Sequence, residues 1–331
     1  MKKRLYSTAA ITLFTGILLA GCGDESEKSS TGNESEKDAF KIGVTQLVQH
    51  DSLDQAYEGF QAALKDSDIK AKYDLQIAQG DQNNSQTIAN NFVGDKVDLI
   101  FANSTPSALS SVNATKDIPI VFTSVTDPVA AELVSSLEKP GGNVTGTTDS
   151  HPEAIEKSMK FLAEELGAKT IGTVYNTGEQ NSVVQIKNVK AEAKKAGLKI
   201  VEASVSTSAE VKQATESLIG KADALYIITD NTVVSALESV ISVANEQDIP
   251  LFVGELDSVN AGGFAAYGFS YYDIGYEAGE KAVEILKDDK KPGDIAVQYP
   301  QKLKLVINET AAKEMGIEIK EEWKANAEFV K

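Results

Sequence analysis

The sequence predicts an α/β fold made of two similar doubly wound lobes, each built on a parallel sheet, with a ligand cleft between them. Its 331 residues are enough for about two domains. From residue 40 onward, short runs rich in β-branched and aromatic residues alternate with segments of helical periodicity, which is typical of βαβ units. Short motifs of the first half also recur in the second half.

Eight runs are predicted as strands because each is short, apolar and bounded by turn or cap residues. They lie at residues 41–47, 72–78, 97–103, 119–125, 170–176, 198–205, 222–229 and 250–255. Helical periodicity fills most of the segments between them. This alternation predicts parallel rather than antiparallel pairing, because parallel strands need a crossover connection.

Three motifs recur in the same order, and each lies next to a predicted strand. The pairs are Ile42-Gly43 with Ile171-Gly172, Lys96-x-Asp98 with Lys221-x-Asp223, and Asp117-Ile118-Pro119 with Asp248-Ile249-Pro250. Chance could supply any one of them. Together they indicate two lobes of similar topology.

The start of the chain predicts a lipoprotein signal peptide. A basic opening, MKKR, precedes an apolar run at residues 9–20 that is too short to span a bilayer. The run closes on LAGC, which resembles the bacterial lipobox, where the cysteine is acylated. We therefore expect residues 1–21 to be removed and Cys22 to anchor an extracytoplasmic protein to the cell membrane. Residues 22–39 are expected to form a flexible tether, since no large apolar side chain follows Cys22 before Phe40.

Composition excludes several partners and chemistries. The chain has 49 acidic residues against 32 lysines and arginines, a net charge of −17, so nucleic acid is a poor partner. One cysteine and two histidines leave no disulfide within the chain and little basis for a metal site or cofactor, so we expect neither. The only arginine is Arg4, so the mature protein must hold any ligand carboxylate without a guanidinium group.

Polar residues gather where the predicted strands end, which is where open parallel sheets bind ligands. Asp127, Glu179, Asp230 and Glu255 lie at such ends, and a ligand ammonium group would pair with them. No lysine lies among these strand-end segments, which favours a neutral or zwitterionic small molecule. Residues such as Ser104 could instead only cap helices, and this alternative stays open.

Aromatic residues lie near the expected crossings between the lobes, namely Tyr175, Tyr267, Phe269, Tyr271 and Tyr272. They could hold an apolar or aromatic ligand side chain, or they could pack the core and hinge. His50, beside Asp51 and Asp54, could act in acid–base chemistry or as a hydrogen-bonding residue of the cleft, and the second reading is the more common one.

Several stretches are similar to a known family, the ABC transporter substrate-binding lipoproteins of the type I periplasmic-binding-protein fold, which includes tryptophan and tyrosine binders. The matching stretches are QLVQHDSLDQAYEGF (46–60), VDLIFANSTPSA (97–108), IPIVFTSVTDPVAAELV (118–134), PGGNVTGTTD (140–149), IGTVYNTGEQNS (171–182), ALYIITDN (224–231) and GGFAAYGFSYYDIGYEAG (262–279). The resemblance implies a receptor that delivers an amino acid to a membrane permease and its ATPase.

The resemblance also implies three chain crossings, near residues 147–149, 268–271 and 299–304. The first lobe would then comprise 40–147 plus 271–300, and the second 148–270 plus 301–331. The binding positions that it implies are Asn103, Ser104, Thr105, Ser124, Asp127, Glu179, Asn181, Ser182, Asp230, Asn231 and Glu255.

We expect a binding protein and not an enzyme. The sequence contains no G-x-S-x-G, P-loop, G-x-G-x-x-G or H-E-x-x-H motif. The expected ligand is an aromatic amino acid, namely tryptophan, tyrosine or phenylalanine. The alternatives are a lipoprotein that senses its ligand and signals to a membrane receptor, a binder of a sugar or nucleoside, and an extracytoplasmic hydrolase.

Overall fold

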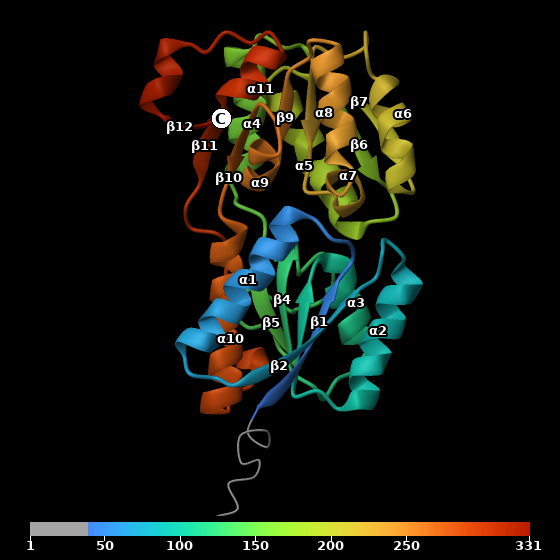
Figure 1. The fold of residues 1–331 in the computed structure, drawn as a ribbon, viewed down its shortest axis with the longest axis vertical. Coiled ribbons are helices and arrows are strands. Elements are labelled where there is room, and N and C mark those ends of the chain that lie inside the picture. Colours follow the sequence, from blue (N-terminus) through green and yellow to red (C-terminus); the bar gives the residue numbers. More distant parts are fainter. Residues whose placement is uncertain (1–38) are drawn as a thin grey trace, which may run out of the picture. The chain divides into compact units, whose positions relative to one another are not determined.

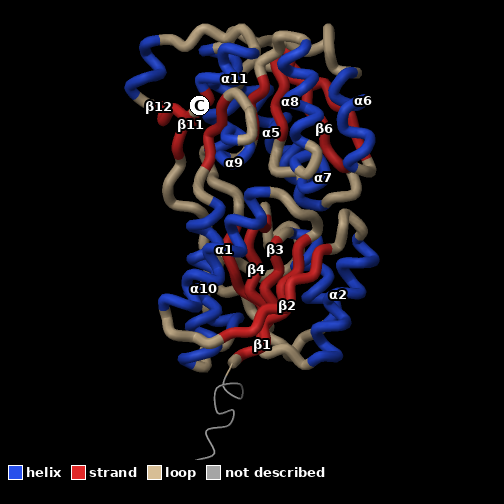
Figure 2. Tube along the Cα trace, viewed as in Figure 1, coloured by secondary structure: helices blue, strands red, loops and turns tan. Residues whose placement is uncertain are grey.

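A computed structural model describes residues 39–331. The predicted signal peptide, Cys22 and all but the last residue of the predicted tether lie outside this range. Within it, no helix combines the length and the apolar character needed to cross a membrane. The described chain forms two sheets with helices on both sides, which confirms the predicted α/β class (Figures 1 and 2).

The first sheet has five parallel strands in the order β2-β1-β3-β4-β5. Its strands are β1 (Phe40–Gln46), β2 (Ala71–Ile77), β3 (Leu99–Asn103), β4 (Ile120–Val125) and β5 (Val144–Thr148), and its connecting helices are α1 (Asp51–Asp66), α2 (Gln82–Asp95) and α3 (Thr105–Ala114). One core cluster, with Ile88 and Phe92 of α2, covers one face. Another, with Phe60 of α1 stacked 4.0 Å from Phe101, covers the other.

The second sheet has seven strands in the order β12-β11-β10-β9-β8-β6-β7. Its strands are β6 (Thr170–Asn176), β7 (Lys199–Val205), β8 (Ala224–Ile227), β9 (Leu251–Val253), β10 (Ala265–Gly268), β11 (Lys304–Asn308) and β12 (Ala327–Val330). Only the β10–β11 pair is antiparallel. The five strands β6 to β10 repeat the order of the first sheet, second-first-third-fourth-fifth, as the recurring motifs predicted.

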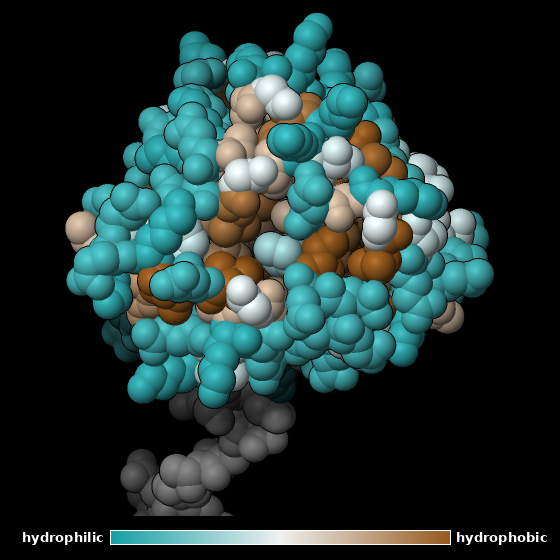
Figure 3. All heavy atoms as spheres, turned by 90° about the horizontal axis from the view of Figure 1, so that it is seen from above, coloured by the Kyte–Doolittle hydropathy of each residue, from teal (hydrophilic) through white to brown (hydrophobic). Residues whose placement is uncertain are grey.

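The remaining helices surround the second sheet or return to the first. They are α4 (Ala154–Lys160), the π-helical turn η1 (Phe161–Glu165), α5 (Gln180–Lys195), η2 (Ser208–Glu210), α6 (Val211–Glu216), α7 (Asn231–Val234), α8 (Leu237–Glu246), α9 (Leu256–Asn260), α10 (Tyr271–Asp288), η3 (Pro292–Asp294), α11 (Glu309–Glu314) and η4 (Glu321–Ala325). Hydrophobic residues reach the surface at the end of the second lobe, where hydrophilic residues surround them (Figure 3).

Helix α10 follows a strand of the second sheet in the sequence but packs against α1 of the first lobe (Figure 1). The two helices approach so closely that glycine is required at the contact. A Cβ atom on Gly275 would lie 1.9 Å from the backbone oxygen of Ala56, and one on Gly59 would lie 2.1 Å from that of Tyr272. These distances are shorter than van der Waals contact, so a larger residue would force the helices apart.

We expect Gly275→Ala to lower the free energy of unfolding by about 1–3 kcal/mol, because an added methyl group overpacks this contact. Gly94→Ala in α2 is the matched control, since no atom of the described residues lies within 4 Å of its added Cβ. There the change should stabilise the helix by about 0.5–1 kcal/mol. Urea unfolding of both variants measures the difference. Equal stabilities would contradict the close packing of α1 and α10.

Candidate ligand-binding cleft

A small enclosed cavity lies between the two lobes at the carboxyl ends of their strands. It is lined by His50, Leu53, Ser124, Asp149, Thr229, Asn231, Val234, Glu255 and Tyr271. These residues lie at or shortly after the ends of β1, β4, β5, β8, β9 and β10, so both sheets contribute to the wall. This is the edge at which doubly wound sheets bind ligands.

A second pocket continues from the cavity toward solvent, and His50, Val234 and Glu255 line both spaces. The other residues of this mouth pocket are Gln49, Asp51, Ser52, Ser235, Leu237, Glu238, Asp257, Ser258 and Ala261. No lysine or arginine lines either space among the described residues. The cleft therefore presents carboxylates, and the only described side chain on its walls that could carry a positive charge is His50.

Asp149 and Glu255 form the acidic end of the cavity. The Tyr271 hydroxyl donates a hydrogen bond to Asp149 Oδ2 at 2.9 Å, while Asp149 Oδ1 is buried and has no hydrogen-bond partner among the described residues. Glu255 Oε1 accepts a hydrogen bond from Ser258 at 2.8 Å. Burial raises the pKa of Asp149 to about 6 and also raises the pKa of Glu255. A cationic group placed here would stabilise both carboxylates in their charged form.

His50 stands between the cavity and its mouth. Burial lowers the pKa of His50 to about 4, although nearby acids, with Asp54 the strongest, oppose this shift. The imidazole is therefore neutral at physiological pH, and its Nδ1 atom is buried with no hydrogen-bond partner within residues 39–331. At the rim, burial and the charge of Glu255 raise the pKa of Asp257 to about 6.

Of the eleven binding positions implied by the sequence, Ser124, Asn231 and Glu255 line the cavity. Asn103 lies behind the wall, because all of its amide groups are hydrogen-bonded within the first lobe. Its Nδ2 donates to Gln46 and to the Leu53 carbonyl, and its Oδ1 accepts from Ser124 at 2.8 Å. Asn103 thus fixes the position of a wall residue.

Three further positions lie where α3 and the loop after β4 begin. Ser104 caps α3 through the Ser107 amide and has a φ of 141°. Asp127 Oδ1 accepts hydrogen bonds from two backbone amides of its own loop, at 3.1 and 2.9 Å. Thr105 differs from these, because its buried Oγ1 has no hydrogen-bond partner in the part of the chain that the structure describes.

In the second lobe, Glu179 and Asp230 hold the start of α7. Glu179 accepts hydrogen bonds from the backbone and side chain of both Asn231 and Thr232, and from Asn181 Nδ2. Asp230 accepts from the amides of Asn176 and Val233 and from Ser182 Oγ. Burial, followed by the charge of Glu179, raises the pKa of Asp230.

Direct contact of these buried residues with a ligand stays a prediction, and their observed hydrogen bonds are those of capping groups. Sequence reasoning did not select Asp149 or Thr229, and it treated His50 and Tyr271 only as possible cleft or packing residues. Asp149 could have been found, since it is the acid that ends PGGNVTGTTD at the first expected crossing.

The lobes are joined by hydrogen bonds across the cleft. Gln185 Nε2 of α5 donates to Thr126 Oγ1 in the first lobe at 3.0 Å and to Thr229 Oγ1 in the second at 2.6 Å. Gln82 Nε2 at the start of α2 donates to the Gly178 carbonyl at 2.8 Å. These contacts depend on the two lobes lying close together, so they belong to a closed arrangement.

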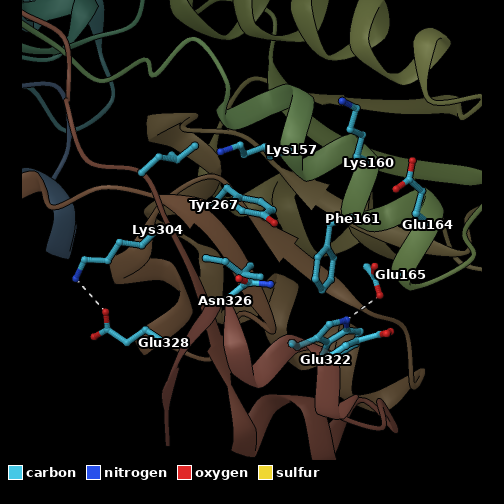
Figure 4. Close-up of a pocket in the computed structure, with 13 residues that line it drawn as sticks. Lys157, Lys160, Phe161, Glu164, Glu165, Tyr267, Lys304, Glu322, Asn326 and Glu328 are labelled. Carbon is cyan, nitrogen blue, oxygen red and sulfur yellow. Dashed lines mark hydrogen bonds and ion pairs between the residues drawn. The ribbon is translucent and has the colours of Figure 1, made fainter.

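Another pocket lies within the second lobe and shares no residue with the cleft (Figure 4). Its walls come from α4, the π-helical turn η1 and the segment leading to β12, and they include Phe161, Tyr267 and Trp323. Its acidic residues Glu328 and Glu165 pair with Lys304 and with the Trp323 ring nitrogen, respectively.

Among residues 39–331, no group of three or more histidines, cysteines or acids is arranged to hold a metal ion.

The fold and the strand-end cleft are those of a two-lobed solute-binding protein. The chain belongs to the family of ABC transporter substrate-binding proteins, whose model matches residues 41–331. This membership confirms the predicted type I periplasmic-binding-protein fold and a binding function in place of an enzymatic one, and it assigns the protein an extracytoplasmic location.

Two relatives illustrate the family. The chain is 46% identical to a tyrosine-binding protein of Clostridioides difficile (strain R20291), over 96% of this chain and 93% of that protein. It is 34% identical to a protein from Streptococcus pneumonia solved in complex with L-Trp, with a TM-score of 0.83, over 88% of this chain and 100% of that one.

A third relative bears on the arrangement of the lobes. A ligand-free, open structure of a substrate-binding protein with adhesive properties from Clostridium difficile is 44% identical, over 88% of this chain and 99% of that one, but its TM-score is 0.65. The Clostridium difficile protein is thus more similar to this chain in sequence than the protein complexed with L-Trp is, but it is less similar in structure. This chain resembles the ligand complex more than the open form, which agrees with the hydrogen bonds across its cleft.

Proposed function

We propose that this protein is the lipid-anchored binding protein of an ABC importer, and that closure of its two lobes traps an aromatic amino acid, namely tyrosine, tryptophan or phenylalanine. One observation carries the proposal. Asp149 and Glu255 share a cavity that no lysine or arginine of residues 39–331 lines, so we expect the ligand to supply the positive charge. An α-ammonium group does this.

The relatives support an amino acid as that ligand. One is named for tyrosine binding and another is complexed with L-Trp. In this chain the ammonium group would lie against Asp149 and Glu255. The moving units would be the predicted lobes, 40–147 with 271–300 and 148–270 with 301–331. The capping residues around Glu179 and Asp230 would hold the wall in shape as the lobes close.

Thermal unfolding with a ligand panel tests the proposal. The panel comprises the twenty amino acids, ribose, galactose and nucleosides, tested on protein refolded to remove any retained ligand. A ligand at a hundred times its dissociation constant stabilises the folded state by about 2.7 kcal/mol, which is easily seen as a rise in melting temperature. Stabilisation by aromatic amino acids supports the proposal. A response only to sugars or nucleosides would contradict the ligand class.

We expect Cys22→Ala to abolish membrane anchoring, because LAGC offers one acylation site and stable anchoring needs acyl chains in the bilayer. Membrane fractionation and metabolic labelling with a fatty acid measure the loss. Ser30→Ala, in the predicted tether, is the control and should remain anchored. If the Cys22 variant still fractionates fully with the membrane, the lipoprotein assignment is wrong.

A further inference from the structure

We propose that Gln185 is a latch between the lobes: its side-chain amide binds the Thr126 hydroxyl of the first lobe when the cleft closes, and this contact slows the release of a bound ligand. The inference rests on the proposed function and adds a positioning residue that lines neither the cavity nor its mouth pocket. It is carried by three hydrogen bonds of one glutamine and by the burial of both partners.

Helix α5, which bears Gln185, is an element of the second lobe that meets the first lobe. It packs on β6 and β7 of the second sheet, and it also contacts α3 of the first lobe. Just before α5 begins, the Gly178 carbonyl accepts a hydrogen bond from Gln82 of the first lobe at 2.8 Å. Gln185 lies in the second turn of the same helix, so its side chain can reach groups of both lobes.

The second lobe fixes the orientation of the Gln185 amide. The backbone N–H of Thr229 donates to Gln185 Oε1 at 3.3 Å. Because a backbone N–H can only donate, the amide oxygen faces it and the amide nitrogen faces the hydroxyl groups. Nε2 then donates to Thr229 Oγ1 at 2.6 Å and to Thr126 Oγ1 at 3.0 Å. Two bonds within the second lobe therefore hold the amide, and its remaining hydrogen is directed at the first lobe.

The hydrogen bond between Gln185 and Thr126 is shielded from water, since each residue is 7% exposed. The bond from Gln82 to Gly178 is exposed, so water can replace it at little cost. Without the Gln185 amide, a closed cleft would bury Thr126 Oγ1 without this donor, whereas an open cleft would let water supply one. Removal of the amide therefore penalises the closed form alone.

This difference between the two forms acts on ligand release. A ligand trapped by closure leaves after the lobes separate, and separation breaks the bond between Gln185 and Thr126. The bond forms after the ligand has entered, so it does not affect the rate of entry. The latch also adjoins the proposed ammonium site, because burial raises the pKa of Asp149 and hydrogen bonding by the Tyr271 and Thr126 hydroxyls opposes that rise.

Release of labelled L-tyrosine from the full-length protein tests the proposal. A chase with unlabelled L-tyrosine gives the dissociation rate, and calorimetric titration gives the affinity, so the two together give the association rate. Gln185→Met keeps the length of the side chain without its amide. It should raise the dissociation rate about tenfold and leave the association rate within about twofold. In Thr126→Val, which lacks the hydroxyl, the same change should raise the dissociation rate no more than about threefold.

Gln213→Met is the control, because it makes the same substitution at an exposed glutamine of α6 that lines neither space of the cleft. Its dissociation rate should stay within about twofold of the wild type. Equal effects of Gln185→Met with and without the Thr126 hydroxyl overturn the latch, as does a change confined to association. In both cases L-tyrosine still binds, so the proposed function stands. If the wild type binds no aromatic amino acid, the proposed function fails, and the same chase with the sugar or nucleoside that stabilises the protein decides on the latch.

Discussion

Asp149→Asn should weaken the binding of L-tyrosine by roughly ten- to a hundredfold, because the loss of a hydrogen bond to a charged group costs about 1.5–3 kcal/mol. Asparagine has the shape of aspartate, so the cavity keeps its form and only the charge is removed. The Tyr271 hydroxyl, which donates to Asp149 Oδ2, can still donate to the amide oxygen. Calorimetric titration measures the change.

The same carboxylate predicts a pH dependence. The pKa of Asp149 is raised to about 6 by burial, and an ammonium partner lowers it, so the ligand prefers the ionised protein. Affinity should be constant above neutral pH and fall as pH drops through 6, reaching about tenfold weaker near pH 5. Burial of Glu255 shifts its pKa in the same direction. In Asp149→Asn this decline should be smaller.

Asp95→Asn is the control for this prediction. Asp95 is the last residue of α2, is exposed and lines neither the cavity nor its mouth pocket. Its substitution should leave the affinity within about twofold of the wild type, as expected for a surface change. Equal losses in both variants would show that Asp149 is not the ammonium site.

Glu179→Ala should lower the free energy of unfolding by about 3 kcal/mol or more, because the buried carboxylate accepts hydrogen bonds from two backbone amides and three side chains. Without it, the amides of Asn231 and Thr232 at the start of α7 stay buried and unpaired. Urea unfolding monitored by far-ultraviolet circular dichroism measures the loss.

Glu216→Ala provides the reference, since Glu216 is exposed near the end of α6 and its substitution should change stability by less than about 0.5 kcal/mol. A Glu179 variant as stable as this reference, but deficient in ligand binding, would make Glu179 a ligand contact. That outcome would show that Glu179 binds the ligand, as the sequence implies. It would contradict a role limited to capping α7, which the hydrogen bonds of Glu179 indicate.

The sequence predicted the strands that are apolar and bounded by turns. It missed the short or polar strands, whose extended conformation is stabilised by pairing with adjacent strands of the sheet. All eight predicted runs contain strands, with ends displaced by a few residues. Strand β5, VTGTT, was missed because it is polar and short, yet its five residues are buried between β4 and the segment at Gln298. Strands β10 to β12 were missed because they have only four or five residues each, too few to give a clear apolar run.

The edge of the sheet that holds the site could be predicted from the sequence, but only some of the residues on its wall could, namely Ser124, Asn231 and Glu255. Polar residues at strand ends serve both as helix caps and as ligand contacts, and spacing does not separate the two roles. Glu179 and Asp230 illustrate this, because their carboxylates are fully used inside the second lobe. Asp149 faces the cavity because of the crossing after β5, which the family resemblance marked through the stretch PGGNVTGTTD but which strand and helix periodicity did not.

The packing of α10 on α1 sets an order of events during synthesis and export. The first lobe cannot complete its core until residue 288 is available, because α10 supplies Ala278, Ala282 and Ile285 to it. Tyr276 also donates a hydrogen bond to Asp66 across 210 residues of chain. Contacts so distant in sequence form slowly. The N-terminal lobe therefore stays incompletely folded while most of the polypeptide is still being made. An incompletely folded chain can be transported across a membrane and fold on its outer side.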